Sequence, residues 1–271
     1  MLELLLKPID FNKILLIIGI IAILSIILAL LIVLISKLCF VQEDEKAKAI
    51  SSHLGGANCG GCGYAGCADF AKALSNGEAQ VNACGSISDE DKKAICDIMG
   101  VPFVSAPKTF AVVKCAGGIN AKDKFDYVGT PSCLVENLSL GGRKICLDGC
   151  LGHGTCASVC SENGIKVKNG VAVIDSKSCL SCGACVIKCP KNLIELIPRT
   201  AKVYIACSSK CRGKEVMNAC SVGCIGCGLC AKNCPNGAIT MENNLPVIDY
   251  KKCTGCLVCV QKCPRKIIKE I

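Results

Sequence analysis

Three runs of cysteine in the C-terminal half share one spacing, C-x2-C-x2-C-x3-C followed by proline. They are Cys179, Cys182, Cys185 and Cys189; Cys224, Cys227, Cys230 and Cys234; and Cys253, Cys256, Cys259 and Cys263. In bacterial ferredoxins this spacing lets three cysteines ligate one [4Fe-4S] cluster while the fourth ligates the neighbouring cluster. The runs therefore predict iron–sulfur binding and one-electron chemistry, in preference to zinc or structural cysteine.

A fourth group of cysteines lies nearer the N-terminus, in the stretch NCGGCGYAGC and beyond. Its members are Cys59, Cys62, Cys67 and Cys84. The glycines between the first three allow the backbone to fold closely round a ligand, and we favour a cubane cluster over zinc. Gly61 to Gly66 also matches G-x-G-x-x-G, but no strand precedes it, so no dinucleotide site is expected. Ser88 predicts a capped helix that ends near Gly100.

The C-terminal half repeats itself at a constant shift of 74 positions. The shift places Cys146, Cys150, Cys156 and Cys160 on Cys220, Cys224, Cys230 and Cys234, and the run from Cys179 on the run from Cys253. It also places Cys133 on Cys207. A short apolar strand is expected before the second run of each copy. The repeat predicts two ferredoxin-like copies, each a small α+β fold wrapped round two clusters.

The first copy lacks one expected ligand, because His153 stands where the second copy has Cys227. His153 could ligate the cluster itself, Cys146 could supply the missing thiolate, or the cluster could be lost. We favour Cys146. The crossed pairing then gives one cluster to Cys146, Cys150, Cys156 and Cys189 and the next to Cys160, Cys179, Cys182 and Cys185. The second copy uses Cys224, Cys227, Cys230 and Cys263 for one cluster and Cys234, Cys253, Cys256 and Cys259 for the other.

These assignments account for five [4Fe-4S] clusters. The cysteines left over from the repeats are Cys115, Cys133, Cys207, Cys211 and Cys220. They leave two alternatives open: a sixth cluster whose ligands the spacing cannot choose, or buried free thiols.

The N-terminal region predicts a single membrane anchor. Residues 14–36 form an uncharged, mostly Ile and Leu stretch, which is long enough to cross a bilayer. A secretory signal would have a shorter apolar region with small residues after it. Thiolate-bound iron requires a reducing compartment, so we expect the cysteine-rich part on the cytoplasmic side of the cell membrane. The domains expected are the anchor and a charged connector (1–50), the four-cysteine module (51–100) and the ferredoxin-like copies (101–200 and 201–271).

The formal net charge of +9 does not predict a nucleic-acid partner. It counts the cysteines as neutral, although an oxidised cubane with four thiolates carries roughly two negative charges. We interpret the lysines as neutralising the clusters, because no basic patch with interleaved aromatic residues is present.

The anchor, the CGGCGYAGC module completed by Cys84, and the C-terminal repeats together resemble the family of B subunits of Rnf electron transport complexes, in its long form with two ferredoxin copies. The resemblance covers nearly the whole chain. It implies a subunit that accepts electrons from soluble reduced ferredoxin and passes them to other subunits of a membrane complex. That complex reduces NAD and moves sodium ions or protons, and its flavin and NAD sites lie on other subunits, not on this chain.

Two other functions are compatible with the cysteine pattern. One is an iron–sulfur subunit of another membrane oxidoreductase, of hydrogenase or formate type, although such a subunit needs only the repeats and not the Cys59 module. The other is an iron–sulfur sensor, which hardly needs five clusters in series. No set of catalytic residues is present in this chain, so catalysis is expected to belong to an assembly.

Overall fold

The structure, a computed structural model, describes residues 11–38, 44–105 and 107–271. The first residues of the expected charged connector, 42–43, lie outside the described residues. The chain divides into one unit up to Asp44 and a second from Glu45 to Ile271. In the first unit, helix α1 (Phe11–Leu38) contains the apolar stretch Leu15–Ile35, whose length and composition suit a membrane span. Its leucines and isoleucines are exposed, which fits a helix surrounded by lipid.

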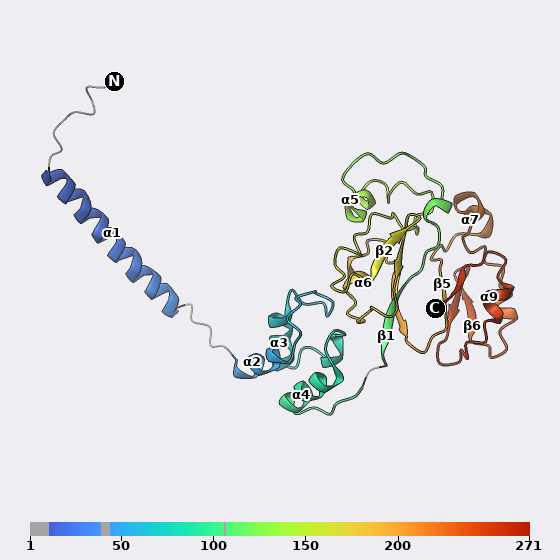
Figure 1. Cartoon of the computed structure of the whole chain (residues 1–271), viewed down its shortest axis with the longest axis horizontal. Coiled ribbons are helices and arrows are strands. Elements are labelled where there is room, and N and C mark those ends of the chain that lie inside the picture. The colour runs from blue at the N-terminus through green and yellow to red at the C-terminus, as the bar shows by residue number, and fades with distance from the viewer. Residues whose placement is uncertain (1–10, 39–43, 106) are drawn as a thin grey trace, which may run out of the picture. The chain divides into compact units, whose positions relative to one another are not determined.

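The second unit begins with a small helical module made of α2 (Glu45–Ser52), α3 (Cys67–Ser75) and α4 (Asp89–Met99), with a 3-10 turn at Val81–Ala83 (Figure 1). The Ser88 hydroxyl accepts a hydrogen bond from the Asp91 N–H at 3.0 Å, and Gly100 ends α4 in a left-handed conformation with φ of 72°. The capped helix expected from the sequence is therefore confirmed. Ile50, Phe70, Leu74 and Ile95 form the core of this module.

Each ferredoxin-like copy contains two antiparallel pairs of strands. In copy 1, β1 (Thr109–Val113) pairs with β4 (Ile194–Pro198) and β2 (Ile165–Lys168) with β3 (Val171–Ile174), beside α5 (Cys133–Leu138), α6 (Ala184–Lys188) and a 3-10 turn at Gly118–Asn120. In copy 2, β5 (Val203–Ile205) pairs with β8 (Ile268–Glu270) and β6 (Ile239–Glu242) with β7 (Leu245–Ile248), beside α7 (Gly213–Ala219), α8 (Leu229–Lys232) and α9 (Val258–Lys262). The α+β class is confirmed.

The shift of 74 positions holds for most of the repeat but not at its start. The elements β2, β3 and α6 map onto β6, β7 and α9 with that shift. The first strands, β1 and β5, are not related by that shift. Cys115 lies two residues beyond β1, and Cys207 lies two residues beyond β5. Cys115 and Cys146 are 31 positions apart but Cys207 and Cys220 only 13, so copy 1 is longer here by 18 positions. The structural counterpart of Cys207 is therefore Cys115, and Cys133 belongs to the insertion.

The cores of the two copies combine their own cysteines with apolar side chains of the strands. In copy 2 the buried cysteines Cys224, Cys230 and Cys259 share one cluster of side chains with strand residues such as Val203 and Ile268. Copy 1 has an equivalent core. The outer face of β1 and β4, with Phe110 and Ile197, packs against tyrosines of copy 2, which joins the copies. Metal binding to such a core is expected to contribute directly to folding.

Candidate iron–sulfur sites

All 26 cysteines within the described residues are free thiols. In that same part of the chain, no group of His, Cys, Asp or Glu lies close enough together to hold a single metal ion. A cubane is larger than one ion, so its four sulfur ligands stand further apart than the ligands of a mononuclear zinc site. Sets of four cysteines that face a common cavity are therefore the candidate cluster sites.

Copy 2 brings together both sets of cysteines that the ferredoxin spacing pairs. One cavity is lined by Cys224, Cys227, Cys230 and Cys263, and a second by Cys234, Cys253, Cys256 and Cys259. The Ala238 N–H donates to Cys234 Sγ at 3.3 Å. Hydrogen bonds of this kind stabilise cluster-bound sulfur and tune its potential. Gly226 and Gly228 have φ of 68° and 69°, which lets the first run curl round its cavity.

The first cavity of copy 1 contains a cysteine that the sequence did not assign. It is lined by Cys133, Cys150, Cys156 and Cys189, and not by Cys146. Burial raises the pKa of the Cys156 thiol to about 12, and neighbouring thiols, Cys133 among them, add to the rise. The Leu193 N–H donates to Cys189 Sγ at 3.4 Å. The donor set is again four cysteines, which fits a cubane.

Cys146 lies elsewhere. It lines a separate cavity together with Cys115, Cys207 and Cys220. The geometry therefore favours Cys133 over Cys146 as the partner of Cys150. The physical reason is the insertion: α5 begins at Cys133 and carries a thiol to the place that Cys227 supplies in copy 2.

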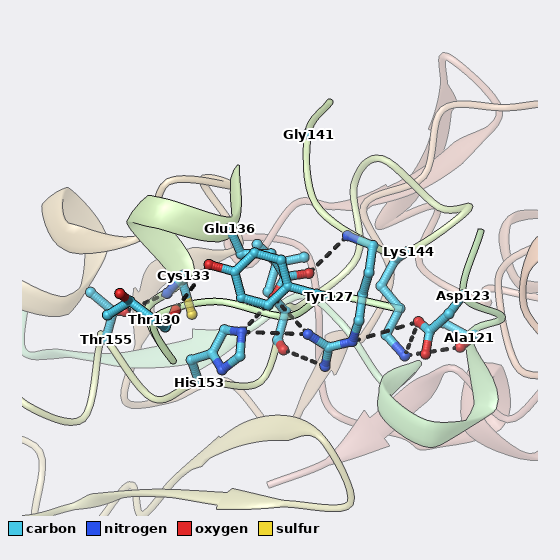
Figure 2. Close-up of polar contacts among 12 residues, drawn as sticks. Ala121, Asp123, Tyr127, Thr130, Cys133, Glu136, Gly141, Lys144, His153 and Thr155 are labelled. Atoms are coloured by element: carbon cyan, nitrogen blue, oxygen red, sulfur yellow. Dashed lines mark hydrogen bonds and ion pairs between the residues drawn. The ribbon is translucent and has the colours of Figure 1, made fainter. Parts of the chain in front are cut away.

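His153 does not line the copy 1 cavity, and its imidazole is used in a different way. Its Nε2 contacts Glu136 Oε2, and the Glu136 carboxylate, which is completely buried, also accepts a hydrogen bond from Arg143 Nη1 at 2.6 Å. The Arg143 backbone N–H donates to the other carboxylate oxygen at 2.8 Å. Figure 2 shows Glu136 and Cys133 on α5 with His153 beside them. The histidine thus anchors the helix that carries Cys133, rather than facing the cluster cavity.

The second site expected in copy 1 comprises Cys160 and the first three cysteines of the run that follows, and these thiols lie near one another. Burial raises the pKa of the Cys185 thiol to about 11, and the nearby thiols Cys182, Cys179 and Cys160 raise it further. Cys179 Sγ accepts hydrogen bonds from the Ala111 and Ser181 N–H groups, each at 3.4 Å. The set again suits a cubane.

In the helical module, Cys62, Cys67 and Cys84 pack against the core around Phe70, while Cys59 is exposed. The Asn58 side-chain oxygen accepts a hydrogen bond from the Cys67 N–H at 2.8 Å, which fixes the loop before α3. Cys84 Sγ lies 3.3 Å from the Ser86 hydroxyl. Three of the expected ligands thus share one core, and Cys59 lies on the loop beside them.

The helical module also touches copy 1. A Cβ on Gly61 would collide with the Cys182 carbonyl oxygen, and one on Gly85 with the Ser181 carbonyl oxygen. Only glycine permits this approach. Cys59 is also close enough for its charge to raise the pKa of Cys182, after the larger effect of burial. The four-cysteine module and the second site of copy 1 are direct neighbours.

A fold of two ferredoxin-like copies, with cysteine-lined cavities and N–H groups directed at sulfur, defines an iron–sulfur electron-transport protein. Family models agree: residues 54–85 match a model described as "Putative Fe-S cluster", 172–195 a "4Fe-4S binding domain", and 223–267 a "4Fe-4S dicluster domain".

Three relatives resemble most of the chain. The B subunit of the Na(+)-translocating ferredoxin:NAD(+) oxidoreductase complex of Acetobacterium woodii is 38% identical over 89% of this chain and 73% of its own length. The B subunit of the ion-translocating oxidoreductase complex of Methanosarcina acetivorans is 37% identical over 87% and 90%. The B subunit of the proton-translocating ferredoxin:NAD(+) oxidoreductase complex of Clostridium ljungdahlii is 37% identical over 89% and 86%. The chain belongs to this family, the B subunits of the ion-translocating (Rnf) oxidoreductase complexes.

Proposed function

We propose that this chain is the membrane-anchored electron relay of such a complex. It accepts electrons from soluble reduced ferredoxin and delivers them to other subunits, which reduce NAD and move ions. The names of the Acetobacterium and Clostridium relatives, both parts of ferredoxin:NAD(+) oxidoreductase complexes, support the donor and the final acceptor. The observation that supports the proposal is the presence of cavities lined by four cysteines in both copies, together with the contacts of Gly61 and Gly85 that join the helical module to copy 1.

The proposed ligand sets differ from the sequence assignment at one position. A bound [4Fe-4S] cluster supplies a one-electron centre at each set. The sets are Cys59, Cys62, Cys67 and Cys84; Cys133, Cys150, Cys156 and Cys189; Cys160, Cys179, Cys182 and Cys185; Cys224, Cys227, Cys230 and Cys263; and Cys234, Cys253, Cys256 and Cys259. The chain's own contribution is to place these thiols and, in the ferredoxin copies, to direct backbone N–H groups at sulfur, which tunes the potentials of those sites.

The order of the sites gives the relay a direction. The Cys59 module follows the membrane helix in the chain and precedes the ferredoxin copies. It contacts copy 1 through Gly61 and Gly85. We infer that the ferredoxin copies receive electrons on the cytoplasmic side and that the Cys59 module passes them on to the membrane-embedded subunits. The apolar helix α1 anchors the chain in the bilayer.

An anaerobic titration of the purified full-length chain in detergent with reduced ferredoxin tests the proposal. Cluster absorbance is followed together with iron per chain. We expect rapid bleaching of several clusters, with about four iron atoms for each proposed site. A chain fully loaded with iron that ferredoxin does not bleach would exclude ferredoxin as donor and favour another membrane oxidoreductase or a sensor.

A further inference from the structure

Five cysteines outside the sites above surround one cavity between the two copies. Its volume is about 290 Å³, far more than the roughly 30 Å³ that one water molecule occupies in the liquid. The cysteines that line it are Cys115, Cys146, Cys207, Cys211 and Cys220. Copy 1 contributes the first two and copy 2 the other three.

Four of the five are related by the repeat. Cys115 and Cys207 each follow the first strand of their copy, and Cys146 and Cys220 each precede the first cysteine of a ferredoxin run by four positions. The hydrogen bonds repeat as well. Cys115 Sγ accepts from the Cys150 N–H and Cys207 Sγ from the Cys224 N–H, both at 3.4 Å.

Cys146 and Cys220 face the same cavity as Cys115 and Cys207. A Cβ on Gly117 would lie 3.5 Å from Cys220 Sγ and 3.6 Å from Cys115 Sγ, so these two sulfurs approach one point from different copies. Cys146 and Cys207 line the same cavity as these two thiols. The cavity therefore has two thiols from each copy that are related by the repeat, in addition to Cys211.

Backbone contacts between the copies hold this arrangement together. The Lys122 N–H donates to the Ala219 carbonyl at 2.8 Å, and the Ser221 N–H to the Asn120 carbonyl at 2.9 Å, on either side of Cys220. Next to Cys207 and Cys115, the Ser208 hydroxyl donates to the Lys114 carbonyl at 2.9 Å. The positions of the thiols are thus fixed by the docking of one copy on the other.

A cationic side chain donates a hydrogen bond to each of the loops that carry Cys146 and Cys220. Lys191 Nζ donates to the Leu147 carbonyl at 2.8 Å, and Arg265 Nη2 to the Cys220 carbonyl at 3.0 Å. These two residues are also 74 positions apart, and each comes directly after the proline that follows a cysteine run. Positive charge here suits an anionic group bound by four thiolates.

We propose that Cys115, Cys146, Cys207 and Cys220 hold a sixth [4Fe-4S] cluster at the junction of the two copies. Transfer of a preformed cluster from a scaffold that holds it by thiolates exchanges four iron–sulfur bonds for four others: each thiol of this site displaces one scaffold thiolate and gives its proton to it. A single zinc ion fits less well, because these described residues do not lie close enough together for a mononuclear site. Cys211 has no counterpart in copy 1, where Ile119 occupies the equivalent position, and its side chain is exposed. It is therefore not assigned as a ligand.

The proposed junction site rests on the proposed electron relay and adds one centre to it. Cys150, whose N–H contacts Cys115, belongs to the first site of copy 1, and Cys224, whose N–H contacts Cys207, belongs to the first site of copy 2. The junction site therefore lies between these two. Electrons that enter copy 2 would pass through it to copy 1 and then to the Cys59 module.

The test is metal analysis of the full-length holoprotein, purified anaerobically in detergent. We expect about 24 iron atoms per chain, four for each of six clusters. Cys115→Ala and Cys207→Ala should each lose about four iron atoms. Cys211→Ala is the matched control, since it removes a thiol from the same cavity and should lose none.

The proposal is overturned by a wild-type chain with about 20 iron atoms, by one zinc ion per chain in place of the additional iron, or by a Cys207→Ala protein with the wild-type iron content. Because the wild-type count needs no variant, a misfolded mutant does not decide the outcome. The count is also independent of ferredoxin. About 24 iron atoms in a chain that ferredoxin cannot reduce would refute the proposed donor and leave the sixth site intact.

Discussion

The imidazole of His153 contacts the buried carboxylate of Glu136. The ferredoxin pattern would place a cluster ligand at position 153, where copy 2 has Cys227. The two residues form an ion-pair network with Arg143 that holds the insertion of copy 1 in place. A residue that stands at a ligand position thus supports the helix that carries the proposed ligand, Cys133.

Replacing Glu136 by Ala should strongly destabilise copy 1. Removing one partner of a buried ionic network leaves uncompensated charge, which costs about 3–5 kcal/mol. We expect a lower midpoint in chemical unfolding of the holoprotein and loss of iron from the Cys133 site. His153→Ala should lose some stability but keep its iron. Loss of about four iron atoms from His153→Ala in a protein as stable as wild type would identify the histidine as a ligand.

Cys133→Ala should lose about four iron atoms per chain, because Cys133 completes the first site of copy 1. Cys96→Ala is the control. Cys96 is a buried thiol in the core of the helical module and lines none of the proposed sites. Iron analysis and electron paramagnetic resonance of the reduced proteins provide the measurement. A Cys133→Ala protein with the wild-type iron content would return the assignment to Cys146 or His153.

Gly61→Ala should slow the passage of electrons between copy 1 and the Cys59 module without changing iron content. The added methyl group would collide with the backbone at Cys182 and push the two parts away from each other. Gly55→Ala is the matched control, because a Cβ there meets nothing within 4 Å and its backbone is not left-handed. Stopped-flow absorbance after mixing with reduced ferredoxin would report the rates. Equal rates in both variants would show that this contact is not part of the route.

Arg265→Ala should lower the reduction potential of the nearest clusters. Reduction adds negative charge, so removal of a cation makes the reduced state less favourable. Arg265→Lys keeps the charge but loses the paired hydrogen bonds to Gly223 and Cys220, and should shift the potential less. A redox titration monitored by electron paramagnetic resonance would separate the two effects. Identical shifts in both variants would show that the hydrogen bonds, and not the charge, matter.

Removing iron with a chelator should unfold the ferredoxin copies before the helical module. The buried core of each copy includes proposed cluster ligands, whereas the buried core of the module, with Phe70 and Ile95, includes none of its proposed ligands. Hydrogen exchange should therefore become fast in β2–β3 and β6–β7 while α4 keeps part of its protection. Loss of protection in all of these segments at the same time would contradict this order.

Much of the fold and site could be predicted from spacing. The three complete runs, the shift of 74 positions and the apolar anchor stretch depend on local sequence, and β2, β3 and α6 recur as β6, β7 and α9. The capped helix after Ser88 was equally local. Such features need no knowledge of which distant segments meet.

Cys133 and the junction cysteines could not be assigned in this way. A constant shift of 74 matched Cys133 with Cys207, because the insertion in copy 1 hides the structural counterpart, Cys115. A clue was present: VVKC and YIAC each place a cysteine just beyond an apolar strand. However, only the docking of the two copies shows that these thiols share a cavity.

The direction of the relay can be tested most directly with Cys59→Ala in the full-length chain. Reduced ferredoxin is mixed anaerobically with this variant and with wild type, and bleaching of the ferredoxin-type clusters is followed by stopped flow. If electrons enter at the copies and leave through the Cys59 module, the copies should be reduced at the wild-type rate. If the variant, with its other clusters intact, can no longer be reduced by ferredoxin, electrons enter at the Cys59 module and the proposed direction is wrong.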